Sequence, residues 1–140
     1  MTDQEIVLRK LAMLREHVER VRRRRGDDAA AFLADVDRQD ALGMSFLVAV
    51  QEAVDIAFHV ATDEGWGLPG ASAEGFEILA RHGVIDTTLA HELALCIRVR
   101  NRIAHGYASV EVERLWRELP AGLDALEHFA AAMARFLGPR

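Results

Sequence analysis

The sequence contains one cysteine, one lysine and three prolines among its 140 residues, and each scarcity excludes something. A single cysteine, Cys96, rules out an internal disulfide and any zinc site built from several cysteines. No uninterrupted apolar run approaches the roughly 18 residues of a membrane span, and the N-terminus lacks a basic tip followed by an apolar stretch. These absences predict a cytoplasmic protein with no membrane association, in which Cys96 is a small core residue.

The remaining pattern is helical. Apolar residues recur at three- and four-residue spacing, and no segment alternates with period two. We therefore predict an all-α, up-and-down helical bundle in which residues 1–140 form one domain. The first predicted helix covers residues 3–24, with a cap at Thr2 or Asp3 and a stop at Gly26; the second covers 28–36, and the third begins at 37 or 40 and ends at 62. The fourth covers 72–83 and is capped by Ser72, and the fifth runs from its cap at Asp86 into the segment 100–107. The last covers 109–137 and is interrupted or bent at Pro120.

Two familiar ligand-binding patterns are absent or out of context. The segment GWGLPG has the glycine spacing of a dinucleotide-binding loop, but a predicted helix precedes it where a strand is needed, so we expect a turn in which Trp66 and Leu68 cover one end of the bundle. None of the six histidines follows a glutamate by three residues or pairs with another histidine four residues away. We expect neither a metal nor a cofactor.

The charge is unevenly distributed. A net charge of −5 argues against a surface that coats nucleic acid indiscriminately, yet arginines cluster in two zones. The first zone is the run Arg22, Arg23, Arg24 and Arg25, which is either an RNA-binding patch or a solvated helix end. The second zone holds Arg98, Arg100 and Arg102, in a segment with no acidic residue between Leu93 and Val110.

A polar stripe interrupts the most apolar predicted helix. Glu52, Asp55 and His59 share one of its faces at three- and four-residue spacing. The simplest account is a buried, hydrogen-bonded seam in which Asp55 or Glu52 holds an arginine. We predict that Asp55 is buried and that it holds Arg100 in position without taking part in any reaction itself.

The segment RNRIAHGY, residues 100–107, places reactive side chains at a predicted helix end. On an ideal helix Arg100 and Tyr107 lie within about 20° of each other, while His105 lies about 140° round from Arg100. Gly106 loosens the last turn, and the helix dipole favours the imidazolium form of His105 there. The residues alone leave two readings open: a structural cap network, or a site for phosphate chemistry.

The segment resembles the signature of HepT-like toxins in the HEPN superfamily, which is arginine, four residues, histidine, one residue and tyrosine. The resemblance extends beyond this motif: AVQEAVDIAFHVATDEGWGLP, GFEILARHGVID and RNRIAHGYASVEVERLW, which includes the motif, resemble successive blocks of that family. The resemblance covers at least residues 38–118. It implies a toxin of a prokaryotic, type VII-like toxin–antitoxin pair, acting as a homodimeric, metal-independent endoribonuclease. Arg100 and His105 would be catalytic with Asn101 supporting them, and an MntA-like nucleotidyltransferase antitoxin would attach AMP to Tyr107.

This chemistry is physically reasonable. RNA is cut without metal when its 2′-hydroxyl attacks the adjacent phosphate, which needs a base and a stabilising cation. His105 can be the base and Arg100 the cation, while a homodimer would supply a second histidine as the acid. Arg98 and Arg102, with the Arg22 to Arg25 run, would contact RNA, tRNA being one candidate. The main alternative is a non-catalytic binding subunit of a minimal nucleotidyltransferase complex; another is a substrate-binding subunit for transfer to a different molecule.

Overall fold

Helices make up most of the described chain. The computed structural model describes residues 1–106 and 111–139, and within these residues it contains helices and no strand. The helices are α1 (Gln4–Arg25), α2 (Ala29–Leu33), α3 (Val36–Asp63), α4 (Glu74–Arg81), α5 (Thr87–Ala104) and α6 (Val112–Leu137). The predicted all-α class is confirmed.

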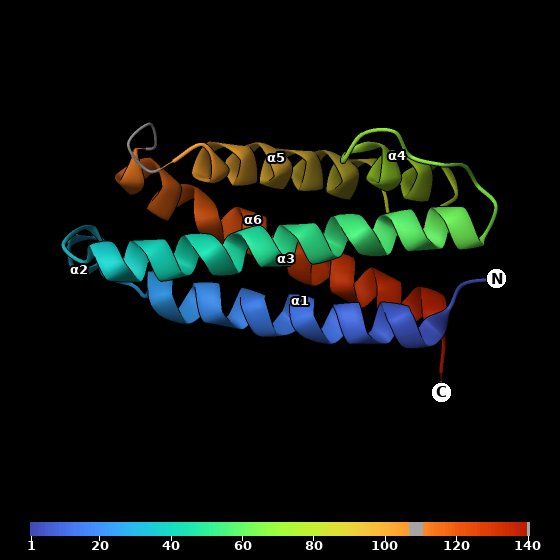
Figure 1. Cartoon of the computed structure of the whole chain (residues 1–140), viewed down its shortest axis with the longest axis horizontal. Coiled ribbons are helices and arrows are strands. Elements are labelled where there is room, and N and C mark those ends of the chain that lie inside the picture. Colours follow the sequence, from blue (N-terminus) through green and yellow to red (C-terminus); the bar gives the residue numbers. More distant parts are fainter. Residues whose placement is uncertain (107–110, 140) are drawn as a thin grey trace.

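The four long helices α1, α3, α5 and α6 run alternately up and down along the bundle (Figure 1). The short helices α2 and α4 lie at opposite ends of it. As a result, the end of α1, the end of α5 and the start of α6 all lie at the end that carries α2. One apolar core draws side chains from all six helices, and Phe32, Phe46, Phe76 and Phe129 are among its largest members.

Helix α3 is the central element of this core. It is the one helix within the described ranges that is long and apolar enough to cross a membrane. However, 56% of its most apolar window is buried inside the bundle, which is the behaviour of a core helix. The breadth of its apolar surface therefore follows from its contacts with helices on several sides.

Most helix boundaries follow local capping chemistry. The carboxylates of Asp3 and Asp86 accept hydrogen bonds from the first turns of α1 and α5, and Gly26 ends α1 with a φ of 62°, all as predicted. Three boundaries differ from prediction. Helix α2 ends at Leu33, three residues before its predicted end. Helix α3 begins at Val36 because Asp35 caps it. Ser72 does not cap α4, since Ala73 holds the N-cap position without a side-chain hydrogen bond. The predicted start of α6 at Ser109 lies outside the described residues.

Helix α6 continues through Pro120, so the predicted interruption is wrong. Proline lacks the N–H that would bond to the carbonyl of Trp116, four residues earlier. The guanidinium of Arg25 donates to that carbonyl from α1, with Nε 2.7 Å from the oxygen. Arg25 also lies 3.8 Å from the centroid of the Trp116 ring, and the indole Nε1 donates to the Arg25 carbonyl at 3.1 Å. Arg25 therefore satisfies the backbone group that Pro120 leaves unpaired.

This contact predicts a stability effect. Arg25→Ala should lower the free energy of unfolding by about 2 kcal/mol, because it leaves the Trp116 carbonyl unpaired and removes the cation over the indole. Pro120→Ala restores an N–H at the missing position, so Arg25→Ala should cost less in that background. Urea unfolding of the four proteins in this double-mutant cycle measures the coupling; equal costs in both backgrounds would refute the capping role.

A buried histidine in α1 makes stability depend on pH. Burial, together with the nearby Arg20, lowers the pKa of His17, while Glu16 and Glu52 oppose the shift and Arg24 adds to it. The unfolded chain therefore binds a proton at a higher pH than the folded chain does, so stability falls as pH drops below about 6.5.

The histidine can be isolated by substitution. Relative to His17→Gln, which cannot titrate, the wild-type protein should lose up to about 1.4 kcal/mol of unfolding free energy per pH unit below pH 6.5. Urea unfolding at pH 7.5, 6.5 and 5.5 measures this difference. A constant difference between the two proteins across that range would contradict the assignment.

Candidate functional site

The predicted motif occupies the last turn of α5. Arg100 and Asn101 lie on the helix, and His105 is its C-cap residue, with its backbone N–H donating to the Asn101 carbonyl at 3.1 Å. Gly106 follows with a φ of 109°, a conformation that favours glycine and turns the chain away from the helix axis. Tyr107 lies outside the described residues. The motif therefore stands at the end of the bundle where α1 ends and α6 begins (Figure 1).

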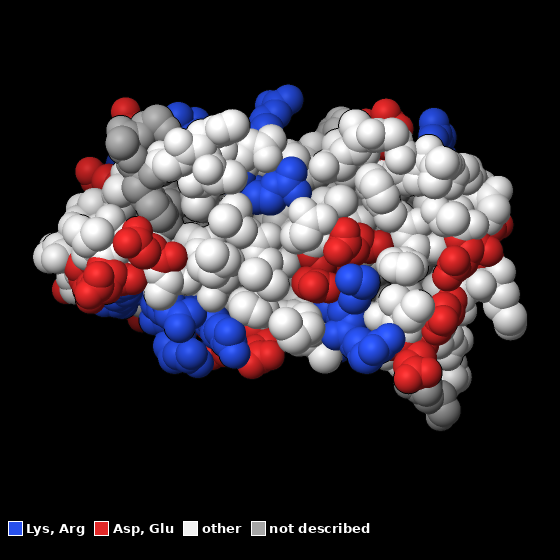
Figure 2. Space-filling model, viewed as in Figure 1, with Lys and Arg blue, Asp and Glu red and all other residues white. Residues whose placement is uncertain are grey.

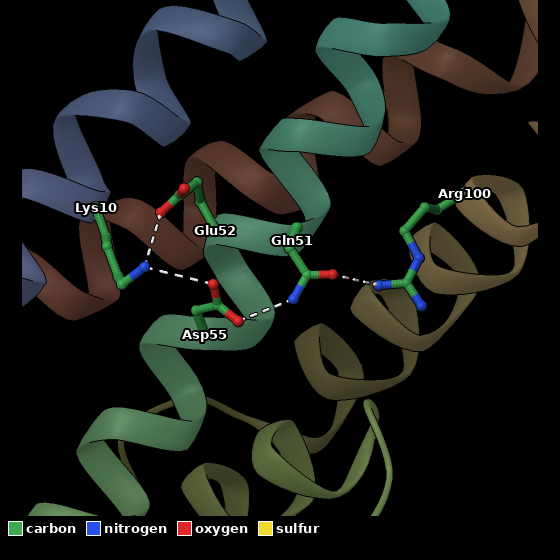
Figure 3. A network of polar contacts seen from close by, with 5 residues as sticks. All are labelled: Lys10, Gln51, Glu52, Asp55 and Arg100. Atoms are coloured by element: carbon green, nitrogen blue, oxygen red, sulfur yellow. Dashed lines mark hydrogen bonds and ion pairs between the residues drawn. The ribbon is translucent and has the colours of Figure 1, made fainter. Parts of the chain in front are cut away.

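Arg100 is half-buried and held by neutral groups. Its Nε and Nη2 donate to Asn101 Oδ1 at 3.3 and 3.1 Å, and its Nη1 donates to Gln51 Oε1 of α3 at 3.3 Å (Figure 3). Both partners are amides, so among the described residues the guanidinium is oriented without being neutralised. A cation in this state suits a phosphate oxygen.

His105 is exposed to solvent, as is Asn101. Within the described ranges the His105 imidazole makes no hydrogen bond or ion pair, and Arg100 does not cap the helix carbonyls. A cap network built on these two side chains is thus absent from the described part of the chain. A site for phosphate chemistry stays a prediction for these two side chains.

The partner of the acidic stripe on α3 is a lysine. Lys10 Nζ of α1 lies 3.4 Å from Asp55 Oδ2 and 3.5 Å from Glu52 Oε2, whereas neither carboxylate pairs with any described arginine (Figure 3). The prediction that Asp55 or Glu52 holds an arginine is therefore wrong. Lys10 reaches the stripe because α1 packs along α3, while Arg100 approaches from α5 on the far side of Gln51.

Asp55 is also less buried than predicted, with its side chain 36% exposed, compared with 18% for Glu52. It still connects to Arg100, though only indirectly. Its Oδ1 accepts a hydrogen bond from Gln51 Nε2 at 2.8 Å, and Gln51 in turn contacts Arg100. Gln51 is not among the residues predicted from the sequence; its one signal is a position four residues before Asp55 on the same helix face.

The other arginines of α5 behave differently from Arg100. Arg102 forms an ion pair with Glu118 of α6. Burial opposes ionisation of that carboxyl, but hydrogen bonds from Arg102 and Arg114 outweigh it and lower the pKa of Glu118. Arg98 is exposed and lines a groove of about 450 Å³ between α5 and α6, alongside Leu95 and Val99. The Arg98 side chain is therefore open to solvent, while the charge of Arg102 is balanced by Glu118.

Cys96 forms part of the floor of the same groove. Burial raises the pKa of its thiol to about 12, so the thiol stays protonated at neutral pH. The predicted role as a small core residue is confirmed, and a nucleophilic thiol is excluded.

The arginine run at the end of α1 is largely used for internal contacts. Arg22 pairs with Asp124 and Glu127 of α6, Arg24 donates to Ser45 of α3, and Arg25 binds Trp116 as described above. Arg23 of the run is exposed. Arg22, Arg24 and Arg25 hold α1 against its neighbours, and an RNA contact by the run stays a prediction that fits Arg23 best.

The glycine-rich segment after α3 is a turn, as predicted. Trp66 packs against the core and stacks on His82, with ring centroids 4.2 Å apart and the planes 5° from parallel. Leu68 is 85% exposed, so the expectation that it covers the bundle end is wrong. Among the residues that the structure describes, no three His, Cys, Asp or Glu side chains gather as metal ligands would.

Comparison with known proteins agrees with this architecture. Residues 14–133 match the family model described as ribonuclease HepT-like. The mRNA nuclease HepT of Shewanella oneidensis is 24% identical over 125 residues, which cover 89% of this chain and 93% of that protein.

Solved structures share the fold. A tri-AMPylated HEPN toxin of Shewanella oneidensis, in complex with its MNT antitoxin, superposes with a TM-score of 0.85 at 24% identity, covering 95% of this chain and 98% of that one. The cytosolic protein YutE of Bacillus subtilis, of unknown function, gives 0.84 at 17% identity, covering 99% and 96%. Because the family model spans most of the sequence, the chain belongs to the ribonuclease HepT-like family.

Proposed function

We propose that this protein is the toxin of a toxin–antitoxin pair and cuts RNA without a metal ion, using Arg100 and His105. The observation that carries the proposal is the state of Arg100, a cation that two amides orient and that no described residue neutralises, five residues before an exposed histidine. Membership in a ribonuclease family supports it. The single core shared by all six helices supports treating the chain as one functional domain.

The proposed reaction is internal transfer at phosphorus. His105 takes the proton of the ribose 2′-hydroxyl, whose oxygen attacks the adjacent phosphorus while Arg100 stabilises the added negative charge on the phosphoryl oxygens. The bond from phosphorus to the 5′-oxygen breaks, and an acid protonates that oxygen. The products are a 2′,3′-cyclic phosphate and a 5′-hydroxyl, so atoms and charges balance. Asn101 keeps the guanidinium of Arg100 in place.

The acid is proposed to be His105 of a second copy, in a homodimer. The face that α3 and α5 present in Figure 2 is largely uncharged, whereas charged side chains gather along α1. Met44 of α3 is 62% exposed. Leu95 of α5 is 55% exposed. These exposed apolar side chains on a largely uncharged face support pairing of two chains across it, which would bring two motifs into one cleft.

Control by an antitoxin completes the proposal. The tri-AMPylated state of the Shewanella oneidensis HEPN toxin in complex with MNT antitoxin supports AMP transfer to Tyr107 by an MntA-like nucleotidyltransferase in the cytoplasm. AMP on Tyr107 would bring a bulky anion near Arg100 and compete with the RNA phosphate. Arg98 and the exposed Arg23 are the arginines best able to add RNA contacts.

The test uses a fluorescent single-stranded RNA and its all-2′-deoxy counterpart, each incubated with the purified protein in excess EDTA. The proposal expects cleavage of the RNA only, because the deoxy strand lacks the attacking hydroxyl. Absence of RNA cleavage under all conditions would favour the non-catalytic binding subunit, and cleavage that EDTA abolishes would refute the metal-free reaction.

A further inference from the structure

We infer that Gln51 of α3 is a positioning residue for Arg100, selected as a neutral acceptor so that the guanidinium stays fixed and keeps its charge for phosphate. The inference rests on the proposed function, since it assigns the phosphate-binding role to Arg100. It adds a residue from a different helix to the motif on α5 (Figure 3).

The amide of Gln51 can adopt only one useful orientation. Its Nε2 donates to Asp55 Oδ1 at 2.8 Å, and its Oε1 accepts from Arg100 Nη1 at 3.3 Å. A carboxylate only accepts hydrogen bonds and a guanidinium only donates them, so rotating the amide by half a turn would lose both contacts. Asp55 is itself held by Lys10. The chain from Lys10 through Asp55 and Gln51 therefore sets the orientation of Arg100.

The neutrality of Gln51 matters as much as its position. A glutamate in its place would form an ion pair with Arg100, as Glu118 does with Arg102 on the same helix. An RNA phosphate would then have to compete with a carboxylate for the guanidinium. Among the described residues, the acceptors around Arg100 are Gln51 and Asn101, both uncharged.

Arg100 retains hydrogen-bonding capacity in this arrangement. A guanidinium has five N–H groups, and three hydrogen bonds to described residues are present. At least two N–H groups are therefore left for phosphate within the described part of the chain. Because Gln51 is solvent-exposed, its replacement should leave folding intact, and any loss should appear in phosphate binding and reaction.

Two substitutions separate position from charge. Gln51→Leu removes the acceptor and keeps the charge of Arg100, so kcat on the fluorescent RNA should fall about 10-fold while affinity for the all-2′-deoxy strand changes little. Gln51→Glu keeps an acceptor but neutralises Arg100, so binding of the deoxy strand should weaken about 10-fold. The slope of log affinity against log salt should also decrease by about 0.7, the value for one lost phosphate contact on a single strand.

Thr62→Glu is the matched control. It adds the same charge to an exposed position of α3, eleven residues from Gln51 and thus about 16 Å along the helix. It should bind and cleave like wild type. Wild-type behaviour of both Gln51 variants, or an equal effect of Thr62→Glu, would overturn the inference.

A readout without RNA separates this inference from the proposed function. Rotation of the Arg100 Nη groups can be measured by ¹⁵N NMR, with the signals assigned by comparison with Arg100→Lys. This rotation should be faster in Gln51→Leu than in wild type. Faster rotation together with no RNA cleavage by the wild-type protein would keep the positioning role and reject the ribonuclease. Unchanged rotation would reject the positioning role whether or not RNA is cut.

Discussion

Replacement of His105 by alanine is expected to reduce RNA cleavage by about 10²- to 10⁴-fold, the usual contribution of a positioned proton-transfer group. The imidazole is exposed at the end of α5 and makes no hydrogen bond or ion pair with the described residues, so its loss should not affect the fold. Single-turnover cleavage of the fluorescent RNA measures the effect. Thermal unfolding and sedimentation should show an unchanged fold and assembly state.

His82→Ala is a useful comparison for this variant. His82 is also exposed and also a C-cap residue, but it belongs to α4 at the opposite end of the bundle, where it stacks on Trp66. It should keep full cleavage activity. If His105→Ala cleaves at the wild-type rate, the histidine does not transfer the proton and the proposed reaction is wrong.

Tyr107→Phe is expected to abolish AMP transfer while retaining much of the RNA cleavage. Phenylalanine keeps the ring but removes the hydroxyl that would attack the α-phosphate of ATP. The variant should therefore resist neutralisation by the nucleotidyltransferase antitoxin. Intact-mass measurement after incubation with antitoxin and ATP should show AMP additions on the wild type and none on the variant.

The same experiment distinguishes three accounts of the antitoxin. AMP on Tyr107→Phe would place the modification on another residue. Neutralisation of the variant without modification would make the antitoxin a binding inhibitor. An unmodified wild-type protein that is nevertheless neutralised would contradict the tyrosine switch as well.

Much of the fold could be predicted because its signals are local. Capping aspartates such as Asp3 and Asp86, and the glycine at position 26, mark helix ends within a few residues of sequence. The order and direction of the helices followed from their lengths and short connections. Pro120 was misjudged because the group that compensates for it, Arg25, is 95 positions away and reaches it only after α1 and α6 pack together.

The site could be predicted only in part, for the same reason. Arg100, Asn101 and His105 are close in sequence, so their motif was visible. Asn101 orients Arg100 from the same helix, but Gln51 does so from α3, and nothing local shows that Gln51 faces Arg100 or that Lys10 reaches Asp55. The clustered arginines could not be interpreted from the sequence alone either. Arg22 and Arg102 suggest free positive charge, but acidic residues of α6, which are not their neighbours in sequence, balance them.

The identity of the new RNA ends tests the central claim most directly. Mass spectrometry of a defined RNA cut by the purified protein in EDTA should find a 2′,3′-cyclic phosphate on one fragment and a 5′-hydroxyl on the other, because the 2′-oxygen is the proposed attacking atom. Fragments ending in a 3′-hydroxyl and a 5′-phosphate would instead require water as the nucleophile, and would contradict the reaction assigned to Arg100 and His105.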